Sequence, residues 1–226
     1  MIDSRIRVLA IDTSTEIAGV AVLRDGDGVA LSWDAGRNQT TTLLDQVDRC
    51  LGLAGIGPAE LNAIAVATGP GMFNGLRVGM SLAKGLAFGL DLPIVGVSTL
   101  DVAAEPWLGL GRTVVAVVAA GRGRVVWQSF FETGKATSEP VNSPLSEFMD
   151  RMRDGRDLLV AGEVPEPESA MLLERGAVIR TGIRGRRDPL ALARLGARRI
   201  DRLGGADLAT LQPRYIHSRP EAVAGA

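Results

Sequence analysis

Glycines and a proline stand where a hydrophobic stretch gives way to a helical one, in the sequence ATGPGMFNGLRVGMSLAKGLA (residues 67–87). Glycine-rich turns between a strand and a helix can hold phosphate groups on their backbone amides. The spacing misses both common phosphate patterns, because G-x-x-x-x-G-K-[ST] is absent and Gly69, Gly71 and Gly75 do not fit G-x-G-x-x-G. We expect the Gly-Pro-Gly-Met turn to be of type II and Asn74 to cap the helix, with Gly69 and Gly71 as candidates for an anion contact.

A second candidate for phosphate chemistry is the turn Asp12-Thr13-Ser14-Thr15, at the end of the strand expected at residues 6–12. An acid followed by small hydroxyl residues can coordinate magnesium or cradle a phosphate. Asp, Ser and Thr are also the usual residues of turns between strands. Asp12, Ser14 and Thr15 are therefore candidates for a nucleotide contact, and an ordinary turn is the alternative.

Small residues recur every four positions in the helix after the glycine-rich turn, at Gly75, Gly79, Ala83 and Ala87. Such a row lets another backbone approach closely. Because a glycine inside a helix costs up to about 1 kcal/mol, close packing must offset the loss. The helix could pack on its own sheet or against a second chain, and both alternatives stay open. Arg77, one turn into the helix, is either solvated or contacts an acidic group of a partner or ligand.

Arginines crowd the segment from residue 180 to residue 202, where only Asp188 and Asp201 oppose them. A basic helix face is most often simply solvated, but it can also contact RNA phosphates. The candidate RNA contacts are Arg184, Arg186, Arg187, Arg198 and Arg202.

Composition excludes several kinds of chemistry. The chain has 226 residues, 46% of them hydrophobic, and a net charge of -1, so nothing global drives it onto nucleic acid or membrane. Cys50 is the only cysteine and His217 the only histidine, which excludes disulfides, cysteine-based zinc sites and mechanisms that need two histidines. We therefore predict no catalytic residue and no metal site. Early charges break up any signal-peptide core, and no apolar run could span a bilayer, so we expect a cytoplasmic protein.

The elements that must position these residues fall into two similar halves. In the first half we expect strands at 6–12, 17–23, 29–33, 61–68 and 93–98, and helices at 40–54, at 75–90 and from 99 to 105. In the second half we expect strands at 113–120, 124–132, 157–162 and 177–181, helices at 143–152, 168–176 and 188–203, and a fraying tail. Two strand-rich openings, each followed by alternating helices and strands, predict a duplicated mixed α/β unit.

Three stretches of the sequence together resemble one family. IDTST near the N-terminus, GPGMFNGLRVGMSLAKGLA and PIVGVSTLDVAA are similar to the TsaB family, also called YeaZ, and the likeness is strong over residues 6–105. The family commonly reads GPGSFTGLR where Met72 and Asn74 stand here. Asn38-Gln39-Thr40 stands where the family often has His-Ser-Glu. The family's Asp-Ala-Arg-x-x-Glu-Val-Tyr is replaced by AAGRGRVV (residues 119–126), with Ala119 and Arg124 where the two acids would stand.

The resemblance implies an α/β fold of two actin-like (ribonuclease H-like) lobes, each a mixed sheet with flanking helices. Residues 1–105 would form an N-terminal, partner-binding lobe. Residues 106–226 would form a smaller C-terminal lobe, with the last helix packing back on the first.

The family role implied is that of a non-catalytic scaffold. It works with TsaD and TsaE in transferring a threonylcarbamoyl group to N6 of the adenosine next to the anticodon in tRNA. The chain alone would bind no cofactor; ATP or ADP and a metal are expected in the assembled complex, and tRNA is contacted through that complex. A homodimer is expected when the chain is alone.

We expect helices 40–54 and 75–90 to form the face that binds the partner. Its predicted residues are Leu43, Val47, Cys50, Gly75, Arg77, Gly79, Met80, Ala83 and Ala87. The alternative function is a stand-alone ATP-dependent small-molecule kinase or nucleotide hydrolase of the same superfamily, in which Asp12 would hold magnesium. An RNA-binding module is a third alternative.

Overall fold

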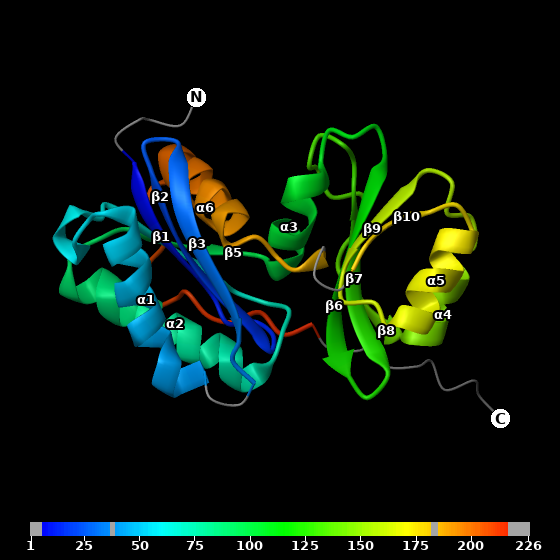
Figure 1. The fold of residues 1–226 in the computed structure, drawn as a ribbon, viewed down its shortest axis with the longest axis horizontal. Helices are drawn as coiled ribbons and strands as arrows, with labels where there is room; N and C mark the ends of the chain where they lie inside the picture. Colours follow the sequence, from blue (N-terminus) through cyan, green and yellow to red (C-terminus); the bar gives the residue numbers. More distant parts are fainter. Residues whose placement is uncertain (1–5, 37–38, 182–184, 217–226) are drawn as a thin grey trace.

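The computed structural model of the chain describes residues 6–36, 39–181 and 185–216, and the side chains of 39–41 are left out (Figure 1). Asn38, Arg184 and His217 therefore lie outside the described residues. The chain forms two lobes, each built on a five-stranded sheet with helices on its faces. This confirms the predicted α/β fold class. Within the described residues, no helix is long and apolar enough to cross a membrane.

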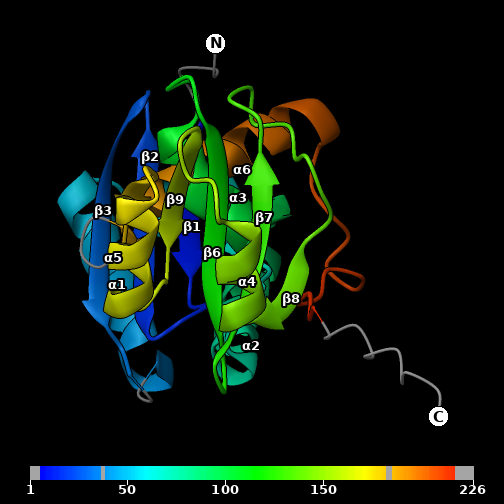
Figure 2. The same ribbon diagram turned by 90° about the vertical axis from the view of Figure 1, so that its right-hand side faces the viewer.

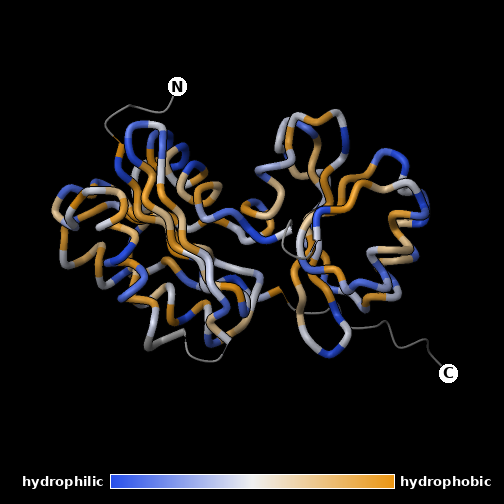
Figure 3. The backbone as a smooth tube through the Cα atoms, in the orientation of Figure 1, coloured by the Kyte–Doolittle hydropathy of each residue, from blue (hydrophilic) through white to orange (hydrophobic). Residues whose placement is uncertain are grey.

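The first sheet has the strand order β3-β2-β1-β4-β5. The strands are β1 (Arg7–Asp12), β2 (Ile17–Arg24), β3 (Asp27–Asp34), β4 (Ala63–Ala67) and β5 (Ile94–Val97). β1, β2 and β3 pair antiparallel, whereas β4 and β5 run parallel to β1. Every residue of β4 is buried, as expected of a parallel strand covered on both faces. Figure 3 shows the hydrophobic colour gathered along the central strands of both lobes.

Helices cover both faces of the first sheet. One face carries α1 (Gln39–Ala54) and α2 (Phe73–Gly89), which pack on Leu9, Ile11 and their neighbours. The opposite face carries α6 (Pro189–Leu203), which packs on Val8, Ala10 and their neighbours. This alternation follows from the strand period, because successive side chains point to opposite faces.

The second sheet repeats the plan of the first, in the order β10-β9-β6-β7-β8. Its strands are β6 (Thr113–Gly121), β7 (Arg124–Phe130), β8 (Val141–Pro144), β9 (Leu158–Gly162) and β10 (Val178–Arg180). β7 and β8 form an antiparallel arm, and β9 and β10 run parallel to β6. The repeated order matches the duplication that the sequence predicts.

The second sheet is also covered on both faces. α4 (Leu145–Arg151) and α5 (Glu166–Glu174) lie over the face that points away from the first lobe (Figure 2). α3 (Thr99–Ala104) lies over the other face, packed on β6. Short 3-10 turns follow α1 and α3, at η1 (Pro58–Glu60) and η2 (Glu105–Trp107).

The two lobes exchange a helix. α3 belongs to the N-terminal half of the chain, yet Leu100, Ala103 and Ala104 pack with strands of the second sheet. α6 belongs to the C-terminal half and packs on the first sheet. The boundary predicted at residue 105 therefore separates the strands of the two lobes but not their helices. α3 and α6 contact each other between the lobes (Figure 1).

Two local predictions need correction. The helix expected at 143–152 is α4, but it begins two residues later with Pro144 as its N-cap, and Ser143 lies in the short strand β8, which was not predicted because its two central residues are polar. The tail does not fray before residue 217. The Ala206 amide donates to the Ile94 carbonyl (2.7 Å) and the Arg214 amide donates to the Thr68 carbonyl (2.7 Å). These bonds hold the tail against the first lobe.

Candidate functional site

The turn after β1 is bound internally by its own side chains. Asp12 is buried, and its Oδ1 accepts hydrogen bonds from the Ser14 amide (2.9 Å) and the Ser14 hydroxyl (2.5 Å). The Thr13 hydroxyl donates to the Gly75 carbonyl of α2 (2.7 Å). The hydroxyl residues thus fix the turn to its own acid and to the neighbouring helix.

The second oxygen of Asp12 meets an arginine from far along the chain. Arg187 Nε donates to Asp12 Oδ2 (2.8 Å), and Nη2 donates to the Thr15 hydroxyl (2.6 Å). Nη1 donates to Oε1 of Glu163, a residue of the second lobe (2.9 Å). The Arg187 side chain is only 6% exposed. Burial alone would lower the pKa of Arg187, but the carboxylates of Asp12 and Glu163 outweigh burial and raise it, so the guanidinium stays charged.

This arrangement does not fit a metal ion at Asp12. Both carboxylate oxygens already accept from donors of this chain, and a guanidinium stands beside Oδ2 where a divalent cation would have to sit. Ser14 and Thr15 are likewise engaged, by Asp12 and Arg187 respectively. The residues proposed as nucleotide contacts therefore form an ordinary, internally bonded turn in this structure. Among the described residues, no group of three or more His, Cys, Asp or Glu side chains could hold a metal.

The glycine-rich turn rests on the Asp12 turn. The Met72 amide donates to the Ser14 carbonyl (2.6 Å), and a Cβ atom at Gly71 would overlap that carbonyl. The predicted type II turn is wrong, because the positive φ belongs to Gly69 (104°) and the Gly69–Pro70 bond is cis. The N-cap of α2 is Met72 and not Asn74. Gly71 is needed for close approach to Ser14.

The row of small residues in α2 faces the first sheet. Gly75, Gly79, Ala83 and Ala87 are all buried, and a Cβ atom at Gly79 would overlap the Thr13 hydroxyl. Of the two alternatives left open by the sequence, packing on the chain's own sheet is the one that these residues adopt. The row explains how α2 approaches β1 so closely.

The predicted interface residues divide sharply by burial. Arg77 is exposed, whereas all the others lie inside the first lobe: Leu43, Val47, Cys50, Gly75, Gly79, Met80, Ala83 and Ala87. Burial also raises the pKa of the Cys50 thiol. These buried side chains therefore offer a partner little accessible surface. The prediction took the apolar side of each helix for a binding surface, but that side packs on the first sheet.

Large apolar side chains remain exposed among polar and charged ones on the outer surface of the same two helices. A groove of about 490 Å³ lies between them, lined by Leu43, Leu44, Arg77, Val78, Ser81 and Leu82. Leu44 is 56% exposed and Phe88, near the end of α2, is 81% exposed. At the start of α2, the Arg77 guanidinium lies 3.8 Å from the centre of the half-exposed Phe73 ring. Leu43 and Arg77 are among the predicted interface residues, whereas Leu44, Phe73 and Phe88 are not, because the prediction followed the apolar side of each helix that the fold buries.

The arginines of α6 are largely used inside the protein. Arg198 pairs with Glu105 (2.9 Å), and Arg199 pairs with Asp101 of α3 (2.6 Å). Together with the buried Arg187, these arginines join the two lobes. Of the predicted RNA contacts, Arg187 is buried and Arg198 is paired, and Arg186 and Arg202 are exposed. The sequence prediction considered only Asp188 and Asp201 within the segment, and missed Asp101 and Glu105, which the fold brings beside the arginines.

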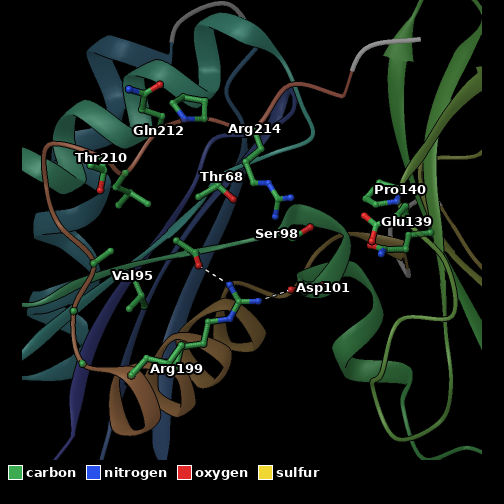
Figure 4. Close-up of a pocket in the computed structure, with 18 residues that line it drawn as sticks. Thr68, Val95, Ser98, Asp101, Glu139, Pro140, Arg199, Thr210, Gln212 and Arg214 are labelled. Carbon is green, nitrogen blue, oxygen red and sulfur yellow. Dashed lines mark hydrogen bonds and ion pairs between the residues drawn. The ribbon is translucent and has the colours of Figure 1, made fainter. Parts of the chain in front are cut away.

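A cavity of about 720 Å³ lies between the lobes, between β5 and the C-terminal tail (Figure 4). Arg199 crosses its floor and donates to the Gly96 carbonyl (2.6 Å) and to Asp101 (2.6 Å). Burial raises the pKa of Asp101, against the lowering effect of Arg199 and Arg214. Arg214 points into the cavity from the tail, and Glu139 faces it from the second lobe. None of the site residues predicted from the sequence lines this cavity.

Comparisons with known proteins identify the family to which the chain belongs. A family model described as TsaD: tRNA N6-adenosine threonylcarbamoyltransferase matches residues 27–164, more than half of the chain. A Haemophilus influenzae protein described as tRNA threonylcarbamoyladenosine biosynthesis protein TsaB is 34% identical over 73% of this chain and 66% of its own length. The Bacillus subtilis protein of the same description is 29% identical over 92% of this chain and 93% of its own length.

A solved structure agrees with the sequence relatives. YeaZ from Pseudomonas aeruginosa is 25% identical to this chain and superimposes with a TM-score of 0.73, over 92% of this chain and 100% of the other. The chain belongs to the TsaB (YeaZ) family. It spans about two thirds of the length of its Haemophilus influenzae relative.

Proposed function

We propose that this chain takes part in making threonylcarbamoyladenosine in tRNA, as a scaffold subunit that binds TsaD rather than as the catalyst. The family and the printed functions of its relatives support the pathway. In this reading TsaD performs the transfer, TsaE joins the complex, and tRNA is reached through the complex. ATP or ADP and the metal belong to the assembled complex.

The observation that carries this proposal is the set of large apolar side chains exposed on the outer surface of α1 and α2. Leu44, Phe73 and Phe88 stay exposed there, next to a groove of about 490 Å³. Exposed aromatic and apolar clusters with a bordering arginine are typical of interface centres. TsaD suits this surface because the family model that describes TsaD also matches this chain, so the two proteins share a related fold. Arg77 would pair with an acidic group of TsaD.

The direct test is a charge placed in the groove. Ser81 is exposed and lines the groove, so Ser81→Arg should leave the fold intact and abolish measurable binding to TsaD. The matched control is Ala170→Arg, because Ala170 is exposed on α5 of the second lobe. Calorimetry with purified TsaD measures the affinity, and circular dichroism confirms folding. Equal TsaD affinities for the two variants would reject this surface.

The biological readout separates the pathway from the surface. Depleting the protein in its own organism should lower threonylcarbamoyladenosine in tRNA, measured by nucleoside analysis. The Ala170→Arg variant should restore the modified nucleoside and Ser81→Arg should not. If depletion leaves the nucleoside unchanged, the pathway assignment fails whatever the binding data show. If Ser81→Arg keeps TsaD affinity but loses sedimentation as a dimer, the groove instead joins two copies of this chain.

The competing function is a stand-alone ATP-dependent kinase or hydrolase. It requires Asp12 to be available to magnesium, whereas both of its oxygens are bonded within the chain. The scaffold proposal expects no tight magnesium–ATP binding by the purified chain in calorimetry. Tight binding that disappears in Asp12→Ala would favour the kinase.

A further inference from the structure

Arg187 lies where the chain passes from the second lobe back to the first. β10 ends at Arg180 in the second sheet, and α6 begins at Pro189 on the first. In this crossing, the Arg187 guanidinium reaches both lobes at once. It donates to Asp12 and to the Ile17 carbonyl (3.2 Å) on one side and to Glu163 on the other.

Both carboxylates are fixed to their own sheets. Asp12 ends β1 and is held by the Ser14 amide and hydroxyl. Glu163 follows β9; its amide donates to the Val117 carbonyl (2.9 Å), and its Oε2 accepts from the Ala119 amide (3.0 Å). A change in the angle between the lobes would therefore pull Arg187 from one carboxylate or the other. Because an unpaired buried charge is costly, such a movement is strongly opposed.

The other ion pairs between the lobes oppose a change of the interlobe angle much less. The Arg198 side chain is 41% exposed where it pairs with Glu105, and the Arg199 pair is also open to water. Exposed pairs contribute little and exchange readily with water. Among the interlobe ion pairs of the described residues, only the pairs that Arg187 makes have an arginine side chain this deeply buried.

We propose that Arg187 is a built-in clamp that holds the two lobes at one angle, using a buried cation of the chain itself that is bonded to both lobes. Asp12 and Glu163 are its fixed anchors. The cavity of about 480 Å³ beside the clamp, lined by Ile17, Glu163 and Arg187 among others, widens when the clamp opens. The proposal stands apart from the scaffold function, since it concerns the shape of the free chain.

The test measures the distance between the lobes. Spin labels are placed at Asp48→Cys on α1 and Ala170→Cys on α5, both exposed, and Cys50 is buried and stays unlabelled. Double electron–electron resonance should give one narrow distance for the parent chain. Glu163→Ala removes the anchor in the second lobe and leaves the Asp12–Arg187 pair intact, so its distances should broaden and lengthen. Arg187→Met should do the same.

The matched control is Arg198→Met, which removes an interlobe arginine from α6, the helix that follows Arg187, and breaks a half-exposed pair with Glu105 of η2. Its distance distribution should stay narrow. Solution scattering gives an independent measure, with a larger radius of gyration for Glu163→Ala and for folded Arg187→Met, and an unchanged one for Arg198→Met. If Arg187→Met fails to fold by circular dichroism, Glu163→Ala carries the test alone. A narrow, unshifted distance in folded Glu163→Ala overturns the clamp.

Discussion

The two faces of the first sheet are covered by helices of opposite character. On the α1/α2 face, large side chains such as Leu9, Ile64 and Met80 fill the core, and the helices expose further large apolar side chains on their outer surface. On the α6 face, the sheet offers mostly alanines, and α6 turns arginines outward. The helices are alike in length but not in what lies beyond them.

The outward-facing side chains of each helix differ according to what packs beyond that helix. Beyond α6 lie α3 and η2, which pack on the second lobe; Asp101 of α3 and Glu105 of η2 meet the arginines. Beyond α1 and α2 lies no further element of the described chain, although Leu44 and Phe88 are apolar. Arg198 and Arg199 of α6 thus find acidic partners within the molecule, whereas Leu44 and Phe88 stay exposed. Each prediction below changes one side of this contrast.

The largest effect is expected at the buried end of the α6 face. Asp12→Ala leaves the Arg187 guanidinium buried with only Glu163 as an acidic partner, and breaking a buried pair in this way costs about 3–5 kcal/mol. Urea unfolding measures the free energy of unfolding. The double variant Asp12→Ala/Arg187→Met removes both charges and should recover part of the loss. A single variant as stable as the parent would contradict the buried network.

A smaller effect is expected from the tight packing of α2 on the α1/α2 face. Gly79→Ala places a Cβ atom against the Thr13 hydroxyl, and overpacking of this kind costs about 1–3 kcal/mol. The matched control is Gly85→Ala on the same helix, where a Cβ atom meets nothing within 4 Å. The control should stabilise the chain by about 0.5–1 kcal/mol, because alanine favours helix over glycine. Thermal unfolding of the pair gives both signs, and equal shifts would refute the close approach.

Much of the fold could be predicted because local pattern and tertiary structure agree. The helix expected at 188–203 is α6, and its predicted start is confirmed by the Asp188 side chain, which accepts from the Leu190 amide (2.9 Å). All the strands expected in both halves are present in the two sheets, and β8 is the one strand of these sheets that was not expected. Each of these elements is long or strongly apolar, so its own residues specify it.

The site could not be predicted in the same way, because its partners are distant in sequence. Arg187 lies 175 positions from Asp12, and nothing in the sequence around either residue indicates that the two pair. The row Gly75–Gly79–Ala83–Ala87 predicts a close approach, but periodicity cannot say whether the approaching backbone belongs to this chain. Likewise, the arginines of α6 look unopposed until the fold brings Asp101 of α3 and Glu105 of η2 beside them.

The smallest effect is expected at the exposed end of the α6 face. Arg198→Met breaks the pair with Glu105, but the arginine is 41% exposed, so the loss should stay below about 1 kcal/mol. Salt sharpens the contrast, because the Debye length falls to about 3 Å at 1 M and screens exposed charges. The Arg198→Met loss should vanish in 1 M sodium chloride, whereas the Asp12→Ala loss should persist there. Unfolding curves at both salt concentrations decide the matter. Equal salt dependence for the two variants would mean that Arg187 is no better shielded than Arg198, and the α6 face would then be one uniform charged surface.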